Sequence, residues 1–295
     1  MLNHWKKACA AALTVSMGLV AHAATVDFTT TYKGSGGNTT GCTAYTFDIV
    51  GKEPAGAGRH PVFVYTVGTS ETVKNGPALA AIQKMADKGY VAAVVGYASG
   101  VMGSCSTITN KARCAFNPLS TQSAIAKICS RAKADCSKGI VTSGFSQGAV
   151  MATLARNFDT RVRATHGMGL HNKYFTFSTS CATPAERKLP KDRLRVSNGE
   201  EDGYGGDTEA SNRATSIAIT GYTCTGTQCL QPNGSGWVVV KNTDVTDGQA
   251  DHCFMRGSGD CLGSQSGASD ANWLNGNNAW GLNAALGWLD SFVNH

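Results

Sequence analysis

The sequence has few charged residues and no cluster of basic ones. Only 16% of its 295 residues are Asp, Glu, Lys or Arg, and the 26 Lys and Arg residues are spread along the chain. Nucleic-acid binding depends on a basic patch or stripe, so this class of partner has no support. The apolar run at residues 8–20 is too short to span a bilayer, and no other run is long enough. The sequence therefore favours neither a nucleic-acid-binding protein nor an integral membrane protein.

Internal repeats, low-complexity tracts and interdomain linkers are also lacking. The length fits one α/β domain with a sizeable core, and we predict a single domain over residues 24–295. No cysteine spacing resembles a zinc site, so we predict neither a metal nor a cofactor. We expect the protein to be a monomer.

The first 23 residues have the pattern of a secretory signal peptide. Lys6 and Lys7 precede the apolar run, which ends in the small-residue cleavage pattern Ala21-His22-Ala23. We predict cleavage after Ala23 and export of the remaining chain, outside the cell or into the periplasm, with no membrane anchor. Losing Lys6 and Lys7 lowers the formal net charge from +6 to +4.

Cysteine is abundant. Cys9 lies in the predicted signal peptide, and ten of the eleven cysteines remain after its removal. An even number in an exported chain predicts disulfides, here up to five. Three pairs are close enough in sequence to close local loops: Cys105 with Cys114, Cys224 with Cys229, and Cys253 with Cys261. The other four allow three pairings: Cys42, Cys129, Cys136 and Cys181.

Cys129 and Cys136 follow a segment that is expected to be helical. Seven residues of intact helix rise about 10 Å, which exceeds the reach of a disulfide. These two cysteines can therefore pair only if the helix ends early.

Strand-like and helix-like segments alternate along the chain. Strand patterns occur at residues 26–32, 44–50, 62–67, 91–96, 162–168, 194–197 and 237–240. Helices are expected at residues 77–88, 120–133, 207–219 and 278–293, and the segment with Cys105 and Cys114 is expected to be a loop. This alternation predicts a mostly parallel central sheet with helices on both faces.

The segment Ile140–Gly148 contains the pattern G-x-S-x-G. A short apolar run ends at Gly144, and apolar residues recur at helical spacing after Gly148. Strand, sharp turn and helix in this order form a nucleophile elbow. Such a turn exposes the serine Oγ in a strained backbone conformation, and only glycine-sized neighbours avoid a clash. Ser146 is therefore the candidate nucleophile.

Acidic residues and a histidine follow two later strands. Glu200, Glu201 and Asp202 come after the strand at 194–197, and His252 lies in the loop after the strand at 237–240. The carboxyl ends of parallel strands meet at the sheet edge where such folds bind ligands. Serine, acid and histidine in this order are expected for an elbow fold.

From about Pro61 to Val293 the chain resembles the secreted serine esterases of the α/β-hydrolase superfamily. The resemblance is carried by Gly144-Phe145-Ser146-Gln147-Gly148, the acid loop and His252 before the last helix. The elbow is similar to that of carboxylesterases, thioesterases and cutinases. This resemblance implies an α/β-hydrolase fold with Ser146 as nucleophile, Asp202 as orienting acid and His252 as general base. The 50 residues between acid and histidine are more than in compact members.

A tetrahedral intermediate of acyl transfer needs two backbone donors. We expect one to be the N–H of Gln147, which follows the nucleophile. We expect the other from the turn after the strand at 62–67, where Thr69 is the best candidate. No metal ligand is assigned.

Several residues compete for the same roles. Glu200, Glu201 and Asp207 stay open as alternative acids, although Asp202 follows the glycine by the usual offset. Asp251 is interpreted as a surface or turn residue. His166 and His171 could line the pocket, but packing or surface roles are favoured. Ser130 and Lys133 match S-x-x-K without its companion motifs, and we interpret the match as chance.

The sequence thus predicts a secreted hydrolase of small-molecule or polymeric carboxylic esters. Alternatives are a serine peptidase or thioesterase on the same fold, or a non-catalytic binding module. Residues 170–192 are too few for a large cap domain, so an open cleft that suits bulky esters is expected. Tyr65, Phe145 and Tyr204 could supply aromatic contacts to substrate.

Overall fold

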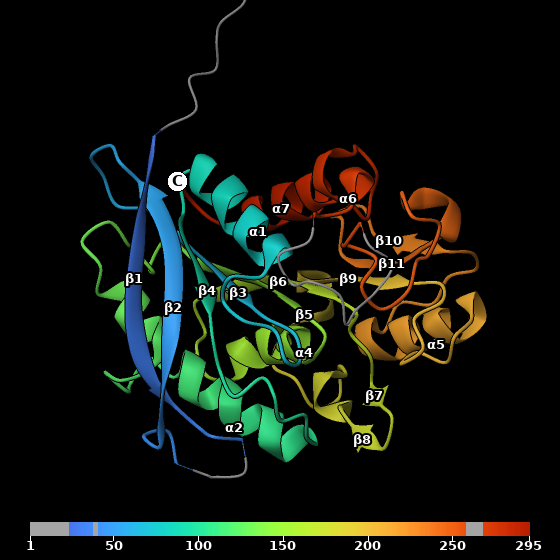
Figure 1. Cartoon of the computed structure of the whole chain (residues 1–295), viewed down its shortest axis with the longest axis horizontal. Helices are drawn as coiled ribbons and strands as arrows, with labels where there is room; N and C mark the ends of the chain where they lie inside the picture. The colour runs from blue at the N-terminus through green and yellow to red at the C-terminus, as the bar shows by residue number, and fades with distance from the viewer. Residues whose placement is uncertain (1–23, 38–40, 258–267) are drawn as a thin grey trace, which may run out of the picture.

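A nine-stranded sheet forms the centre of the computed structural model, which describes residues 24–37, 41–257 and 268–295 (Figure 1). The strand order is β1-β2-β4-β3-β5-β6-β9-β11-β10. The strands are β1 (Thr25–Gly34), β2 (Tyr45–Pro54), β3 (Val62–Thr66), β4 (Val91–Val95), β5 (Ile140–Phe145), β6 (Val162–Met168), β9 (Leu194–Gly199), β10 (Gln228–Leu230) and β11 (Gly236–Val240). A separate hairpin pairs β7 (Lys173–Tyr174) with β8 (Phe177–Ser178). The predicted signal peptide lies outside the described residues.

The central strands β4, β3, β5, β6, β9 and β11 run parallel to their neighbours. The antiparallel strands β1 and β2 form one edge, and β10 forms the other. Every residue of β3, β4, β5 and β11 is buried, because parallel strands are covered on both faces. The prediction of a mostly parallel sheet is confirmed.

Helices cover both faces of this sheet (Figure 1). One face carries α1 (Gly76–Asp87), α6 (Ala271–Asn275) and α7 (Leu282–Asp290), and the other carries α2 (Cys105–Phe116), α4 (Gln147–Leu154) and α5 (Glu209–Thr220). The short α3 (Ala124–Cys129) packs against α2 and β1. In α1, Asn75 caps the N-terminus and Pro77 lies in the first turn, while Ile82 and Met85 are buried against the sheet. The fold is an α/β-hydrolase fold, as predicted.

The segment with Cys105 and Cys114 is a helix, and its prediction as a loop was wrong. Ile108, Ala112 and Ala115 of α2 recur at helical spacing and are buried. Nine residues of helix rise about 13 Å, so Cys105 and Cys114 cannot pair with each other. They pair with distant cysteines instead: Cys42 with Cys114, and Cys105 with Cys181.

The remaining disulfides agree with the other expectations. The helix α3 ends at Cys129, well before the predicted end at residue 133, and Cys129 pairs with Cys136. Cys224 pairs with Cys229, as predicted. Cys253 is disulfide-bonded, and Cys261, its predicted partner, lies outside the described residues.

No large cap domain is inserted between β6 and β9. The segment between them holds only the hairpin β7–β8 and short 3-10 turns, as its length predicts. Among the residues that the structure describes, no helix combines the length and the apolar character needed to cross a membrane. The carboxyl ends of β3, β5, β6, β9 and β11 consequently meet at one open edge, where the candidate site lies.

Candidate active site

Ser146 forms the turn between β5 and α4. Its φ of 52° and ψ of −124° are strained for a residue with a side chain. A Cβ on Gly148 would lie 2.2 Å from the carbonyl oxygen of Val67, and one on Gly144 would lie 2.6 Å from the carbonyl oxygen of Gly148. Neither position accepts a side chain. The Ser146 N–H donates to the carbonyl oxygen of Met168 at 2.8 Å, which ties the elbow to β6.

Asp202 and His252 meet in the loops after β9 and β11. His252 Nδ1 lies 2.7 Å from Asp202 Oδ2, and the backbone N–H of Tyr204 donates to Oδ1 at 3.0 Å. Burial alone would raise the pKa of Asp202, but the imidazoles of His171 and His252 outweigh it and hold this pKa well below its usual range. Asp202 is therefore ionised and accepts hydrogen bonds only. A neutral His252 must carry its proton on Nδ1 and leave Nε2 free to accept one.

His252 Nε2 is buried and has no hydrogen-bond partner among the described residues. His252 and Ser146 line the same pocket. A Cβ on Gly169 would lie 2.7 Å from His252 Cε1, so the end of β6 makes room for the imidazole. The ring of Phe145 packs on it with centroids 4.8 Å apart. No hydrogen bond joins Ser146 Oγ to His252 in the described structure, and such contacts often tighten only when substrate binds.

The alternative acids make other contacts. The carboxylates of Glu200 and Glu201 both accept hydrogen bonds from Asn242. Asp207 lies at φ 66° in the turn before α5. Asp251 accepts the backbone N–H of Cys253 at 2.6 Å. Within the described residues, Asp202 is the acid that is hydrogen-bonded to His252.

His171 contacts the same acid, which the sequence-based interpretation missed. It follows β6 by three residues, and its Nε2 lies 2.8 Å from Asp202 Oδ2. The rule that selected Asp202 and His252, proximity to the carboxyl end of a strand, also applies to His171 and could have identified it. His166 lies within β6 instead, where burial lowers its pKa to about 3. Both histidines are fully buried and neither lines the pocket, so the packing interpretation holds for both, but it did not include the contact of His171 with Asp202.

Thr69 lines the pocket that Ser146 also lines, and Gln147 follows Ser146 as the first residue of α4. The backbone N–H groups of both residues make no backbone hydrogen bond within the described part of the chain. The side-chain Nε2 of Gln147 donates to Thr69 Oγ1 at 3.1 Å, which joins the two segments.

A buried lysine holds Gln147 from behind. Lys111 in α2 donates from Nζ to Gln147 Oε1 at 2.7 Å and to the carbonyl oxygens of Ala98 and Val101. It is 1% exposed, and burial lowers its pKa to about 8. The sequence pattern did not predict helix α2. The place of Lys111 in the site could therefore not be inferred from the sequence.

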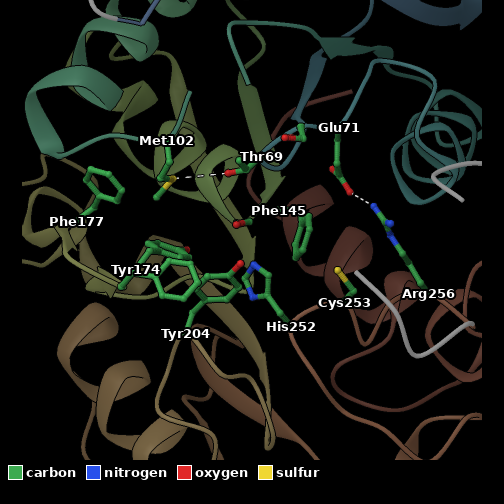
Figure 2. A pocket seen from close by; sticks show the side chains of 13 residues that line it. Thr69, Glu71, Met102, Phe145, Tyr174, Phe177, Tyr204, His252, Cys253 and Arg256 are labelled. Carbon is green, nitrogen blue, oxygen red and sulfur yellow. Dashed lines mark hydrogen bonds and ion pairs between the residues drawn. The ribbon is translucent and has the colours of Figure 1, made fainter. Parts of the chain in front are cut away.

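A buried ion pair supports the Thr69 turn from the other side. Glu71 accepts the N–H of Gly68 at 2.6 Å and the amide of Asn75 at 2.9 Å, and Arg256 completes the pair. Figure 2 shows this pair on one side of His252 and the side chains of Tyr174, Phe177 and Tyr204 on the other. The turn is therefore fixed by side chains from two directions.

The pocket has a volume of ≈ 520 Å³ and one aromatic wall. Tyr174, Phe177 and Tyr204 line it beside His252, with Met102 opposite (Figure 2). Phe175 extends the wall into solvent: it is 72% exposed, and its ring lies 4.8 Å from that of Tyr204. Of the aromatic contacts expected from the sequence, Phe145 and Tyr204 line the pocket, whereas Tyr65 is buried in β3.

His171, Asp202 and His252 also form the one group of described His, Cys, Asp and Glu residues compact enough to hold a metal ion. His252 Nδ1 and His171 Nε2 lie 2.7 and 2.8 Å from the same oxygen, Asp202 Oδ2. Two ligands of a tetrahedral zinc ion lie about 3.3 Å apart, given metal–ligand distances near 2.0 Å. The shorter distances fit two hydrogen bonds better than a pair of metal ligands.

Comparison with known proteins supports the fold. No protein-family model matches the chain, and no curated protein matches it. The chain is similar to the crystal structure of a putative carboxylesterase from Lactobacillus plantarum WCFS1, with a TM-score of 0.54 and 14% sequence identity. The match covers 92% of this chain and 100% of that one. At this identity the similarity supports the α/β-hydrolase fold.

Proposed function

We propose that the protein is a secreted serine hydrolase that cleaves carboxylic esters through an acyl-enzyme intermediate. One observation carries the proposal. His252 is held by the buried Asp202 carboxylate, and its Nε2 has no hydrogen-bond partner among the described residues in a pocket that Ser146 also lines. A serine on a strained elbow beside an oriented imidazole is the arrangement that acyl transfer requires.

The proposed reaction has two halves. Ser146 Oγ attacks the ester carbonyl carbon while His252 Nε2 takes its proton, and the N–H groups of Gln147 and Thr69 stabilise the oxyanion. His252 then gives the proton to the leaving alcohol, which leaves an acyl group on Ser146. Water attacks this acyl group with His252 again as the base, and the acid is released. Asp202 stabilises the imidazolium in both halves.

The aromatic wall supports bulky apolar esters as substrates. Phe175 occupies the first position of the two-residue turn in the hairpin β7–β8, with φ 49°, where glycine is favoured. A large apolar side chain at a strained and exposed position gains little from packing, but it extends the pocket wall. The described segment between β6 and β9 holds no large cap, which leaves this wall open to long or polymeric chains.

Export is part of the same proposal. The predicted signal peptide and the disulfide bonds both fit an oxidising compartment outside the cytoplasm. N-terminal sequencing of the protein recovered from the medium or periplasm tests this part. The expected first residue is Ala24.

Active-site labelling tests the mechanism. A fluorophosphonate probe should modify the mature protein once, on the peptide that contains Ser146, and Ser146→Ala should abolish both labelling and ester hydrolysis. Ser130→Ala is the matched control, because Ser130 is an exposed serine in the S-x-x-K match. It should keep full labelling and activity. Labelling at another residue, or none in folded protein, would favour the binding-module alternative.

A substrate panel separates the enzyme classes. We expect esters to be hydrolysed faster than matched thioesters and peptides, with no effect of EDTA. Phe175→Ala should raise KM for long or aryl esters several-fold and leave KM for an acetyl ester unchanged. Preference for a peptide or thioester would replace the ester assignment, and activity lost to EDTA would replace the serine mechanism with a metal-dependent one.

A further inference from the structure

His171 is a second imidazole on the carboxylate that holds His252. Its side chain is fully buried, and its Nε2 lies 2.8 Å from Asp202 Oδ2, the oxygen that also accepts from His252 Nδ1. The two rings are 5.9 Å apart between centroids. One carboxylate oxygen therefore joins two histidines from loops that lie 31 and 50 residues away in the sequence.

The proton on His171 can be assigned from its surroundings. Asp202 is ionised and can only accept, so Nε2 of His171 must be the protonated nitrogen. Nδ1 of His171 is buried and has no hydrogen-bond partner among the described residues. A second proton there would bury a cationic N–H without an acceptor, which is costly. His171 therefore donates to Asp202 through Nε2, and it does not line the pocket.

The backbone of His171 is held as firmly as its ring. Its N–H donates to Tyr174 Oη at 3.1 Å, its carbonyl accepts from Thr179 Oγ1 at 2.6 Å, and the Tyr174 ring packs edge-on at 5.4 Å. Tyr174 Oη in turn donates to the carbonyl oxygen of Gly169, the residue beneath His252. Rigid attachment of this kind suits a residue that fixes the position of another group.

We propose that His171 is a positioning residue of the hydrolase: its Nε2–H donates to Asp202 and fixes the carboxylate in the orientation that holds His252. The inference rests on the proposed function. A carboxylate that gives part of its charge to His171 binds the His252 imidazolium less tightly. His252 then becomes neutral, and able to accept the serine proton, at a lower pH than it would beside a carboxylate without this donor.

The charged and titratable groups that face His171 are few. Asp202 and His252 lie on one side and Tyr174 on another, and the Tyr204 ring contacts His252. Asp202 is the ionised group among these neighbours at neutral pH, because burial raises the pKa of both tyrosines. A change in the pH profile after substitution of His171 is therefore transmitted through Asp202.

Two substitutions test the proposal against a merely structural role. His171→Phe removes the donor and keeps a ring, whereas His171→Gln places an amide N–H near the position of Nε2. We expect His171→Phe to lower kcat about tenfold with little change in KM, the value of one charge-assisted hydrogen bond. The rising limb of kcat/KM against pH should move up by about half a pH unit or more. His171→Gln should restore both quantities. An unchanged pH midpoint in folded His171→Phe would overturn the proposal.

A measurement on the unaltered protein covers the case in which His171→Phe does not fold. Nitrogen-15 NMR of the histidine rings should show a proton on Nε2 of His171 in the folded protein. Protonation on Nδ1 alone would overturn the proposal, because Nε2 could not donate. This readout is independent of turnover. Failure of Ser146 labelling with the expected tautomer would count against the hydrolase, and normal labelling with the wrong tautomer would count against His171.

Discussion

The two sides of the site are built in different ways. Ser146 and Gln147 adjoin in the chain, and their geometry follows from close backbone contacts around Gly148. Asp202 and His252 come from loops 50 residues apart and are joined by a side-chain hydrogen bond to one oxygen. Ser146 is therefore positioned by the main chain, whereas the acid and the base are positioned by side chains.

This difference determines what a substitution can reveal. On the acid–base side, each substitution removes a group that the mechanism uses directly. On the nucleophile side Ser146 also acts directly, but the two proposed oxyanion donors are backbone N–H groups, which no side-chain substitution deletes. Apart from Ser146, substitutions there act only through groups that position the backbone, such as Thr69 Oγ1 and the Gln147 amide. We expect the loss of a directly acting group and the loss of a positioning group to differ by several orders of magnitude.

The largest effect is expected where the two sides must act together. His252→Ala should lower kcat by about 10⁶-fold, as Ser146→Ala should, because neither group works without the other. The double substitution should be little worse than either single one. Purified proteins are compared by kcat on a soluble ester, with circular dichroism as the control for folding. If the losses multiplied, the two sides would contribute independently and the shared mechanism would be wrong.

Asp202→Asn should cost about 10⁴-fold in kcat, since an amide favours the wrong tautomer of His252. Glu201→Gln and Asp207→Asn are matched controls from the same loop and should stay within about twofold. The three variants are assayed side by side at pH 8. A severe loss in either control together with a mild loss in Asp202→Asn would reassign the acid and leave the rest of the site intact.

The oxyanion side should respond more weakly. Thr69→Val keeps the backbone N–H and the side-chain shape but removes the acceptor of the Gln147 amide. We expect kcat/KM to fall about tenfold, the value of one hydrogen bond that positions the donor. Thr69→Ser keeps a hydroxyl and should retain most of the activity. Equal activity in Thr69→Val and the unaltered protein would mean that the turn is held by Glu71 and Arg256 alone.

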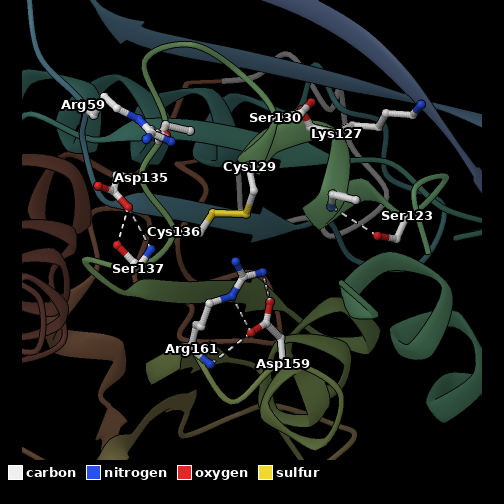
Figure 3. Close-up of a disulfide and its surroundings, with 12 residues drawn as sticks. Arg59, Ser123, Lys127, Cys129, Ser130, Asp135, Cys136, Ser137, Asp159 and Arg161 are labelled. Carbon is white, nitrogen blue, oxygen red and sulfur yellow. Dashed lines mark hydrogen bonds and ion pairs between the residues drawn. A yellow bond between two sulfur atoms is a disulfide. The ribbon is translucent and has the colours of Figure 1, made fainter. Parts of the chain in front are cut away.

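The sequence predicted the features that depend on local pattern. The parallel strands are continuous apolar runs, and the elbow is a contiguous motif, so both could be identified from the chain alone. The sequence left open whether the helix before Cys136 ends early enough for Cys129 and Cys136 to pair, and α3 does end at Cys129. Figure 3 shows Cys129 bonded to Cys136, with Ser123, which caps α3, on the other side of Cys129. Such a short helix has too few turns to show a periodic pattern.

Features that depend on long-range contacts were not predictable. Cys105 pairs with Cys181, 76 residues away, and no local spacing indicates this partner. Lys111 and His171 are polar residues whose partners are chosen by the tertiary fold. In a single sequence Lys111 is indistinguishable from a surface lysine, and the place of His171 after β6 marks it as a candidate without revealing its contact with Asp202. The supporting contacts around Ser146, Asp202 and His252 are therefore the part of the site that the sequence does not reveal.

The smallest expected effect concerns Asp251, the acid next to His252 in the chain. Burial raises its pKa to about 6 in the folded protein, and the nearby Asp202 and Asp247 add to this while His252 opposes it. An unfolded chain has an Asp pKa of about 3.9. Between these values the folded state binds more protons, so this residue lowers stability as pH rises through the window. The substitution Asp251→Asn keeps an acceptor for the Cys253 N–H. It should raise Tm by about 2–4 °C at pH 7, corresponding to about 1 kcal/mol.

At pH 4 this gain in Tm should vanish, because Asp251 is then protonated in the folded protein. The loss of Asp202 ionisation at low pH affects both proteins equally and cancels in the difference. Thermal unfolding of both proteins at pH 4, 5.5 and 7 measures this dependence. Because Asp251 makes no hydrogen bond to His252 in the described structure, kcat should be unchanged. A stability gain that is independent of pH would show that the Asp251 carboxylate is not the cause, and a large fall in kcat would give this acid a catalytic role on the side of the site now assigned to Asp202.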